Sequence, residues 1–185
     1  MRPTSVLLIP GLYDSGPRHW QRQWQRSRGF VCVEQRDWHT PDRAEWVATI
    51  EAAVAATPGP LVLAGHSLGC TTLAHWAAST AHAARVRGVM MVAPSDVEAP
   101  SYPSGTTGFA PVPLARLPFA SLVVTSSDDP YVSLARARHF AAAWGSELLD
   151  VGAAGHLNSD AGYGPWPEGL ALLERLAGPR QERSP

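Results

Sequence analysis

The sequence predicts a doubly wound α/β fold built on one compact, mainly parallel sheet. Short apolar runs alternate with helical segments along the chain, and most of these runs are continuously apolar, as in strands covered on both faces. The 185 residues, 45% of them apolar, are enough for one domain with a buried core. We expect that domain over residues 1–177, followed by a polar, frayed tail over 178–185.

The chain ahead of residue 61 predicts two strands and two helices. The first strand ends at Pro10-Gly11, and the second helix is stopped by Thr57-Pro58-Gly59-Pro60. The expected elements are, in order, a strand over 5–9, a helix over 18–26, a strand over 30–33 and a helix over 44–56.

The remainder predicts four strands and three helices. In order, they are a strand over 61–64, a helix over 68–78, strands over 86–93 and 122–126, a helix over 134–144, a strand over 147–151 and a helix over 168–176. Residues 95–118, between the strands over 86–93 and 122–126, are rich in Pro, Gly, Ser and Thr and predict one long irregular loop. Loops of that length in compact domains tend to be functional or mobile.

The most informative motif is the pentapeptide Gly65-His66-Ser67-Leu68-Gly69, which joins a predicted strand to a predicted helix. This context is typical of a nucleophile elbow, in which the serine occupies a strained turn. Gly65 and Gly69 fit because the strand and helix crowd the positions two residues either side of the serine. The pentapeptide alone also occurs by chance, so the interpretation needs partner residues elsewhere in the chain.

A serine nucleophile requires a histidine base and a carboxylate that orients the base. The strand over 122–126 leads into Asp128-Asp129-Pro130, and the strand over 147–151 leads into Gly155-His156. An aspartate before proline more often caps a helix, and a loop histidine often lies on the surface. Their joint occurrence behind the expected strands favours a catalytic role for His156 with either Asp128 or Asp129.

Backbone N–H groups are expected to bind the oxyanion of the intermediate, one from Leu68 and one from Leu12 in the loop after the first strand. Four aromatic residues on loops predict an apolar substrate pocket, although each is equally suited to packing: Tyr13, Phe109, Tyr163 and Trp166. The chain leaves no room for a sizeable lid, which favours a short acyl group over a long lipid.

Composition excludes several classes of protein. Fifteen basic and sixteen acidic side chains give a net charge of −1 without a basic run, which argues against nucleic acid or an anionic membrane as partner. No apolar stretch approaches the roughly 20 residues of a membrane span or resembles a signal peptide, so we expect a cytoplasmic protein. Cys32 and Cys70 are expected to be reduced, buried and structural. No metal or other cofactor is implied, because no histidine pair has zinc-site spacing.

Several motifs together carry a resemblance to a known family. They are Pro10-Gly11 with Ser15, His19-Trp20, Asp37-Trp38, the pentapeptide at 65–69, Asp128-Asp129-Pro130-Tyr131-Val132, Trp144-Gly145 and Gly155-His156-Leu157-Asn158. Over residues 5–177 the chain resembles the small serine-hydrolase family that includes retinoblastoma-binding protein nine. The resemblance implies an α/β-hydrolase fold without a large lid domain and a triad of Ser67, Asp129 and His156. It selects Asp129 because the family's triad aspartate directly precedes the proline.

The expected function is hydrolysis of a small ester, thioester or amide through an acyl-enzyme, with a small-molecule acyl substrate as partner. One alternative is a non-catalytic binding or scaffolding protein on a hydrolase fold, because fold alone does not define function. Another is an acyltransferase or perhydrolase that uses the same triad.

Overall fold

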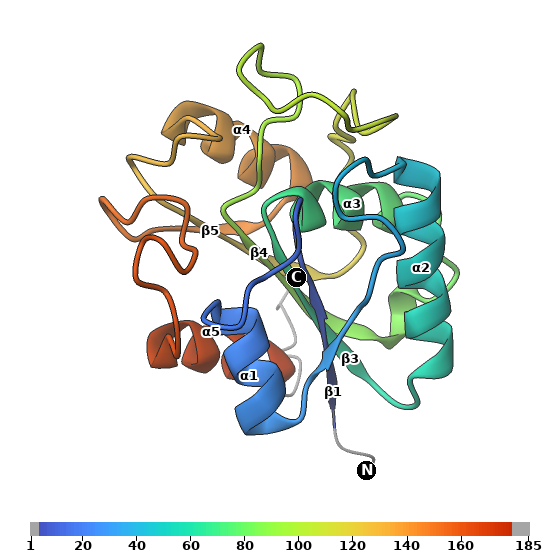
Figure 1. Ribbon diagram of the computed structural model, residues 1–185. Coiled ribbons are helices and arrows are strands. Elements are labelled where there is room, and N and C mark those ends of the chain that lie inside the picture. Colours follow the sequence, from blue (N-terminus) through green and yellow to red (C-terminus); the bar gives the residue numbers. More distant parts are fainter. Residues whose placement is uncertain (1–3, 179–185) are drawn as a thin grey trace, which may run out of the picture.

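The computed structural model describes residues 4–178 and contains a six-stranded sheet in which every neighbouring pair of strands is parallel (Figure 1). The strand order is β2-β1-β3-β4-β5-β6. The strands are β1 (Ser5–Ile9), β2 (Val31–Cys32), β3 (Leu61–His66), β4 (Val86–Val92), β5 (Ala120–Thr125) and β6 (Glu147–Asp150). The predicted α/β class is confirmed.

The helices lie close to their predicted positions. They are α1 (Trp20–Arg28), α2 (Arg43–Ala56), α3 (Leu68–Ala77), α4 (Leu134–Trp144) and α5 (Pro167–Ala177), with a 3-10 turn η1 (Ala83–Arg85). Helix α1 begins two residues later than predicted because His19 is its N-cap and accepts a hydrogen bond from the Gln21 amide. From residue 179 onward, the predicted polar tail lies outside the described residues.

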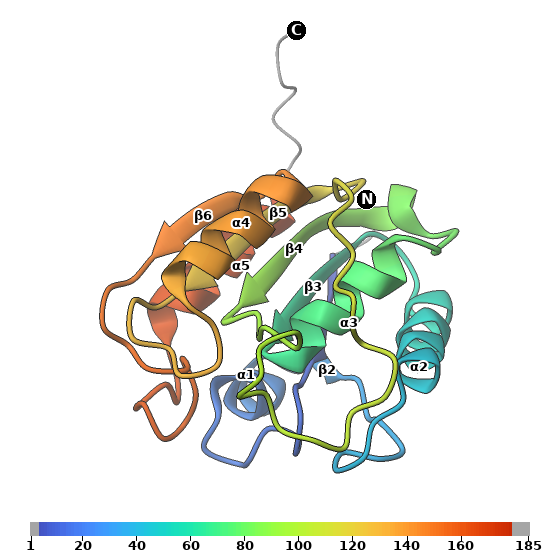
Figure 2. The same cartoon turned by 90° about the horizontal axis from the view of Figure 1, so that it is seen from above.

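Helices cover both faces of the sheet (Figures 1 and 2). Side chains of β1 alternate between the faces: Leu7 and Ile9 join a core with α2, α3 and α4, whereas Leu8 joins a core with α1 and α5. Six tryptophans are buried, in keeping with a packing role: Trp20, Trp24, Trp46, Trp76, Trp144 and Trp166. Strand β6 lies at the edge of the sheet, and its side chains are the most exposed of any strand.

The chain changes direction between β1 and β3. After β1 it crosses outward to β2, and it then returns to place β3 on the other side of β1. The loops that leave β1 and β3 therefore diverge, which opens a crevice at the carboxyl ends of these strands. The buried Gln21 amide ties the two strand ends together, because its Nε2 donates to the Ile9 carbonyl at 3.0 Å and the Ala64 carbonyl at 3.2 Å.

Both cysteines are buried and free, as predicted. Burial raises the pKa of the Cys32 thiol to about 12 and that of the Cys70 thiol still further. Both therefore remain protonated at neutral pH and act as small apolar groups. None of the helices in the described part of the chain has both the length and the apolar character of a membrane span.

Candidate active site

Ser67 lies on the turn between β3 and α3, with φ at 56° and ψ at −123°. A positive φ is strained for a residue with a side chain, so packing around the turn must hold it in place. A Cβ added to Gly65 would lie 2.8 Å from Leu73 Cδ1, and one added to Gly69 would meet the carbonyl oxygens of Ile9 and Pro10. Both glycines are therefore required by close packing.

Ser67, His156 and Asp129 form one hydrogen-bonded chain. Ser67 Oγ lies 2.9 Å from His156 Nε2, and His156 Nδ1 lies 2.9 and 3.0 Å from the two carboxylate oxygens of Asp129. The Asp129 side chain is fully buried and His156 is 8% exposed. An ionised carboxylate only accepts, so Nδ1 carries the proton, and Ser67 donates to Nε2.

Asp128 has a different role from its neighbour. Its Oδ1 accepts from the Ala154 and Gly155 amides, each at 2.8 Å, and from the Ser126 hydroxyl at 2.6 Å. These bonds, that from Ser126 above all, lower the pKa of the Asp128 carboxyl. Asp128 thus anchors the loop that carries His156, whereas Asp129 contacts the His156 ring.

Ser95 is a second hydroxyl beside Ser67. It follows β4 at the start of the long loop, is 1% exposed, and its Oγ lies 2.7 Å from Ser67 Oγ. The single hydroxyl proton of Ser67 is donated to His156, so Ser95 must be the donor in this bond. In the sequence, the only signal that marks Ser95 is its place after the strand next to β3.

Two further histidines adjoin the hydrogen-bonded chain. His66 Nε2 donates to the His156 carbonyl at 2.9 Å, and the rings of His19, His66 and His156 form a row with centroid separations of 4.6 and 4.8 Å. Burial lowers the pKa of His19 to about 3, with smaller contributions from His156 and Arg22, and lowers the pKa of His66 well below 6.5. Both rings are therefore neutral at pH 7.

The two backbone amides predicted to bind an oxyanion adjoin the elbow. A Cβ added to Gly11 would lie 2.8 Å from Ser67 Cβ and 3.3 Å from the Leu68 nitrogen, so the loop after β1 runs against the turn. Leu12 follows Gly11 directly. Within residues 4–178, neither the Leu12 nor the Leu68 N–H donates to a protein acceptor.

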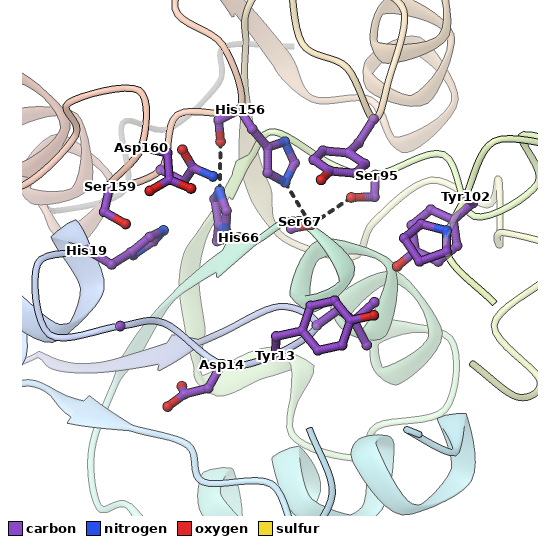
Figure 3. A pocket seen from close by; sticks show the side chains of 15 residues that line it. Tyr13, Asp14, His19, His66, Ser67, Ser95, Tyr102, His156, Ser159 and Asp160 are labelled. Carbon is purple, nitrogen blue, oxygen red and sulfur yellow. Dashed lines mark hydrogen bonds between the residues drawn. The ribbon is translucent and has the colours of Figure 1, made fainter. Parts of the chain in front are cut away.

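A cavity of about 290 Å³ opens around Ser67 and His156 (Figure 3). It is lined by Leu12, Tyr13, Asp14, Gly16, His19, His66, Ser67, Ser95, Tyr102, Pro103, Tyr131, His156, Asn158, Ser159 and Asp160. Tyr13 lines it as predicted, and Tyr102 and Tyr131 add two aromatic side chains that the sequence analysis missed. Within the described residues, no group of three His, Cys, Asp or Glu side chains could hold a metal ion.

Three of the predicted pocket residues do not line the cavity. Phe109 is 1% exposed and packs with Trp46 and Leu68, behind the elbow. Trp166 is buried against the tryptophans of α1, and Tyr163 packs on its ring. These large apolar side chains gain more by joining the core than by facing a wet cleft.

A doubly wound parallel sheet with a serine elbow after β3, an aspartate after β5 and a histidine after β6 defines the α/β-hydrolase class. Over residues 6–175 the chain matches the serine hydrolase family, and it belongs to that family. It is therefore a hydrolase.

Three solved structures share the fold of this chain, and the first of them also exceeds 30% identity. A YdeN-like hydrolase of Pectobacterium atrosepticum is 34% identical, with 95% of this chain and 91% of that chain covered and a TM-score of 0.82. The ydeN product of B. subtilis shares 17% identity, with coverage of 95% and 98% and a TM-score of 0.70. Esterase 2 of Thermogutta terrifontis, phosphonylated by cyclosarin, shares 20% identity, with coverage of 94% and 81% and a TM-score of 0.68. No curated protein matches the chain significantly.

Proposed function

We propose that this hydrolase is a carboxylesterase-like enzyme that cleaves a small ester, thioester or amide through an acyl-enzyme on Ser67. The observation that carries the proposal is the unbroken hydrogen-bonded chain from Ser67 through His156 to Asp129, with bonds of 2.9 to 3.0 Å, beside a cavity of about 290 Å³. This is the geometry expected of a nucleophile, a general base and the carboxylate that orients the base.

In the acylation half-reaction, Ser67 Oγ attacks the substrate carbonyl carbon while its proton passes to His156 Nε2. Asp129 holds the histidine tautomer and stabilises the imidazolium that forms. The oxyanion accepts hydrogen bonds from the Leu12 and Leu68 amides, each worth about 3 to 4 kcal/mol in the transition state. When the intermediate collapses, the bond to the leaving group breaks, and the leaving group takes the proton from Nε2.

In deacylation, a water molecule attacks the acyl-enzyme and gives its proton to His156 Nε2. The second intermediate collapses to release the acid, and the proton returns to Ser67 Oγ. Neutral His19 and His66 suit this cycle, because the transient charge on His156 then meets no second cation in the row of rings.

The size of the cavity favours a small substrate. At about 290 Å³ the cavity lies at the lower end of the roughly 300 to 1,000 Å³ that small-molecule pockets span. A short acyl chain with a compact leaving group fits this volume, whereas a long lipid does not.

Active-site labelling by a fluorophosphonate tests the nucleophile. We expect wild type to be labelled and Ser67→Ala not to be labelled, whereas Ser79→Ala, at an exposed serine on the turn after α3, should behave as wild type. Equal labelling of wild type and Ser67→Ala would refute the proposal.

Turnover of p-nitrophenyl acetate tests the base. We expect His156→Ala to lower kcat by at least 1,000-fold, in line with the loss of general-base catalysis. Equal turnover by wild type and His156→Ala would instead favour a binding protein on a hydrolase fold. Added methanol separates hydrolysis from acyl transfer, because a transferase yields mainly the methyl ester.

A further inference from the structure

The cavity around Ser67 has two chemically different sides (Figure 3). On the side we call the tyrosine side, Tyr13 and Tyr102 face the space next to Ser67. On the opposite side, which we call the polar side, His19, Ser159 and Asp160 gather beyond His66. A substrate whose carbonyl is placed at Ser67 would therefore extend one group toward the tyrosine rings and the other toward His19.

His19 presents an unused hydrogen-bond donor on the polar side. The residue is 4% exposed, and its Nδ1 accepts from the Gln21 amide at 3.2 Å. In a neutral imidazole the other nitrogen then carries the proton, so Nε2 is a donor. Nε2 is buried and has no hydrogen-bond partner among the described residues. A buried donor left unsatisfied is unfavourable, and an acceptor on the substrate would remove that cost.

The charges around the cavity disfavour an anionic substrate. None of the side chains that line it is a lysine or arginine. Asp14 is neutralised by Arg22, whose Nη2 lies 2.7 Å from both carboxylate oxygens. Asp160 makes no ion pair within the described residues and adds a negative charge at the rim.

A cationic group does not match the polar side either. An ammonium group only donates hydrogen bonds, so it offers no acceptor to the His19 N–H. Asp160 is exposed, so water and salt weaken both its attraction for a cation and its repulsion of an anion, and the His19 donor decides the preference. The group that satisfies His19 is an uncharged oxygen.

We propose that the site selects small, uncharged esters that carry an acceptor oxygen, of an ether, hydroxyl or carbonyl, on the polar side. His19 is the residue that determines this preference. The inference rests on the proposed esterase function and narrows its substrate class.

Isosteric ester pairs test the preference. n-Butyl acetate and 2-methoxyethyl acetate differ only by a methylene replaced with oxygen in the leaving group, and methyl pentanoate and methyl 3-methoxypropanoate differ likewise in the acyl group. For at least one pair, we expect wild type to prefer the ether by about 3- to 10-fold in kcat/KM, the value of one net hydrogen bond. Methyl hemisuccinate, which adds an acyl carboxylate, should be a poorer substrate than methyl pentanoate.

The variant His19→Asn keeps the helix cap, because asparagine also accepts from the Gln21 amide, and its shorter side chain withdraws the N–H donor from the cavity. We expect the ether preference, taken as the ratio of kcat/KM for the two esters of a pair, to fall to about one. His19→Ser, which also caps helices, repeats the test if the asparagine variant folds poorly. His139→Asn, at an exposed histidine of α4, is the matched control and should keep the wild-type preference.

The inference is overturned if wild type shows no ether preference in either pair, if the preference survives in both His19 variants, or if the hemisuccinate is the better substrate. Failure of the esterase function gives a different result. In that case wild type hydrolyses none of these esters, or hydrolysis persists in Ser67→Ala.

Discussion

Ser95 Oγ lies 2.7 Å from Ser67 Oγ and donates a hydrogen bond to it, while Ser67 donates to His156. The hydroxyl of Ser67 is thus fixed by one donor and one acceptor, and its proton points at the base. Because Ser95 is 1% exposed, its own hydroxyl has little freedom to turn elsewhere. In the proposed mechanism, Ser95 is therefore a positioning residue for Ser67.

We expect Ser95→Ala to lower kcat for p-nitrophenyl acetate by about 2- to 10-fold, the range for loss of one net hydrogen bond. KM and the melting temperature should change little, because the side chain is small and the nucleophile stays in place. Steady-state kinetics and thermal unfolding measure these effects. A rise in KM with unchanged kcat would show that Ser95 acts on substrate binding instead.

Substitutions of the two adjacent aspartates should affect activity and stability differently. Asp129→Asn leaves the histidine in the wrong tautomer, so kcat should fall by roughly 10,000-fold with a nearly unchanged melting temperature. Asp128→Ala removes the acceptor of the Ala154 and Gly155 amides, so it should lower the melting temperature and reduce activity only in part. Parallel kinetics and calorimetry test this separation, and an equal loss of activity in both variants would contradict it.

The loop after β1 should not tolerate a side chain at Gly11. The added Cβ of Gly11→Ala would lie 2.8 Å from Ser67 Cβ and 2.9 Å from the His66 carbonyl oxygen, so the loop must move away from the elbow. We expect kcat to fall by about 100-fold, the effect of losing one oxyanion donor, while cooperative unfolding persists. Wild-type turnover by Gly11→Ala would exclude this loop from the oxyanion site.

Stability should fall on mild acidification. The pKa of His19 is about 3 in the folded state and near 6.5 when unfolded, so the unfolded chain binds more protons between these values. His19 then removes up to about 1.4 kcal/mol of unfolding free energy per pH unit as the pH falls below 6.5. In His19→Asn this slope should be shallower, whereas His139→Asn should keep it. Urea denaturation between pH 7.5 and 4.5 measures the slopes, and an identical slope in wild type and His19→Asn would refute the assignment.

The elements of the fold could be predicted from sequence because their signals are local. The apolar run of β3 and the glycine at 65 are set by neighbours within about eight residues, whereas the need for glycine at 69 comes from the distant carbonyl oxygens of Ile9 and Pro10. Local neighbours also set Gly145, which ends α4 in the left-handed conformation. Pairing of β3 with β4 is not local, and the contact between Ser67 and Ser95 depends on it.

Aromatic residues on loops were the weakest part of the prediction. The position of Tyr13 on a loop correctly predicted that it lines the cavity. Loop position does not show, however, whether the side chain of Phe109 or Trp166 faces the cavity or the core. Phe109 packs on Trp46 and beside Leu68 of the elbow, both distant in the sequence. Trp166 packs on Trp20 of α1, more than 140 residues earlier in the sequence. Tyr102 lies in the loop predicted to be functional, yet nothing in its immediate sequence marks it as lining the cavity.

The adjacent carboxylates that follow β5 bind two different parts of the loop that carries His156. Asp128 accepts hydrogen bonds from the backbone of the loop that leads to His156, and Asp129 binds the His156 ring. A small shift of the end of β5 would therefore move the histidine loop and the orienting carboxylate together, leaving their relative geometry intact. The position of His156 thus depends on the dipeptide Asp128-Asp129, which holds both the loop backbone and the imidazole ring.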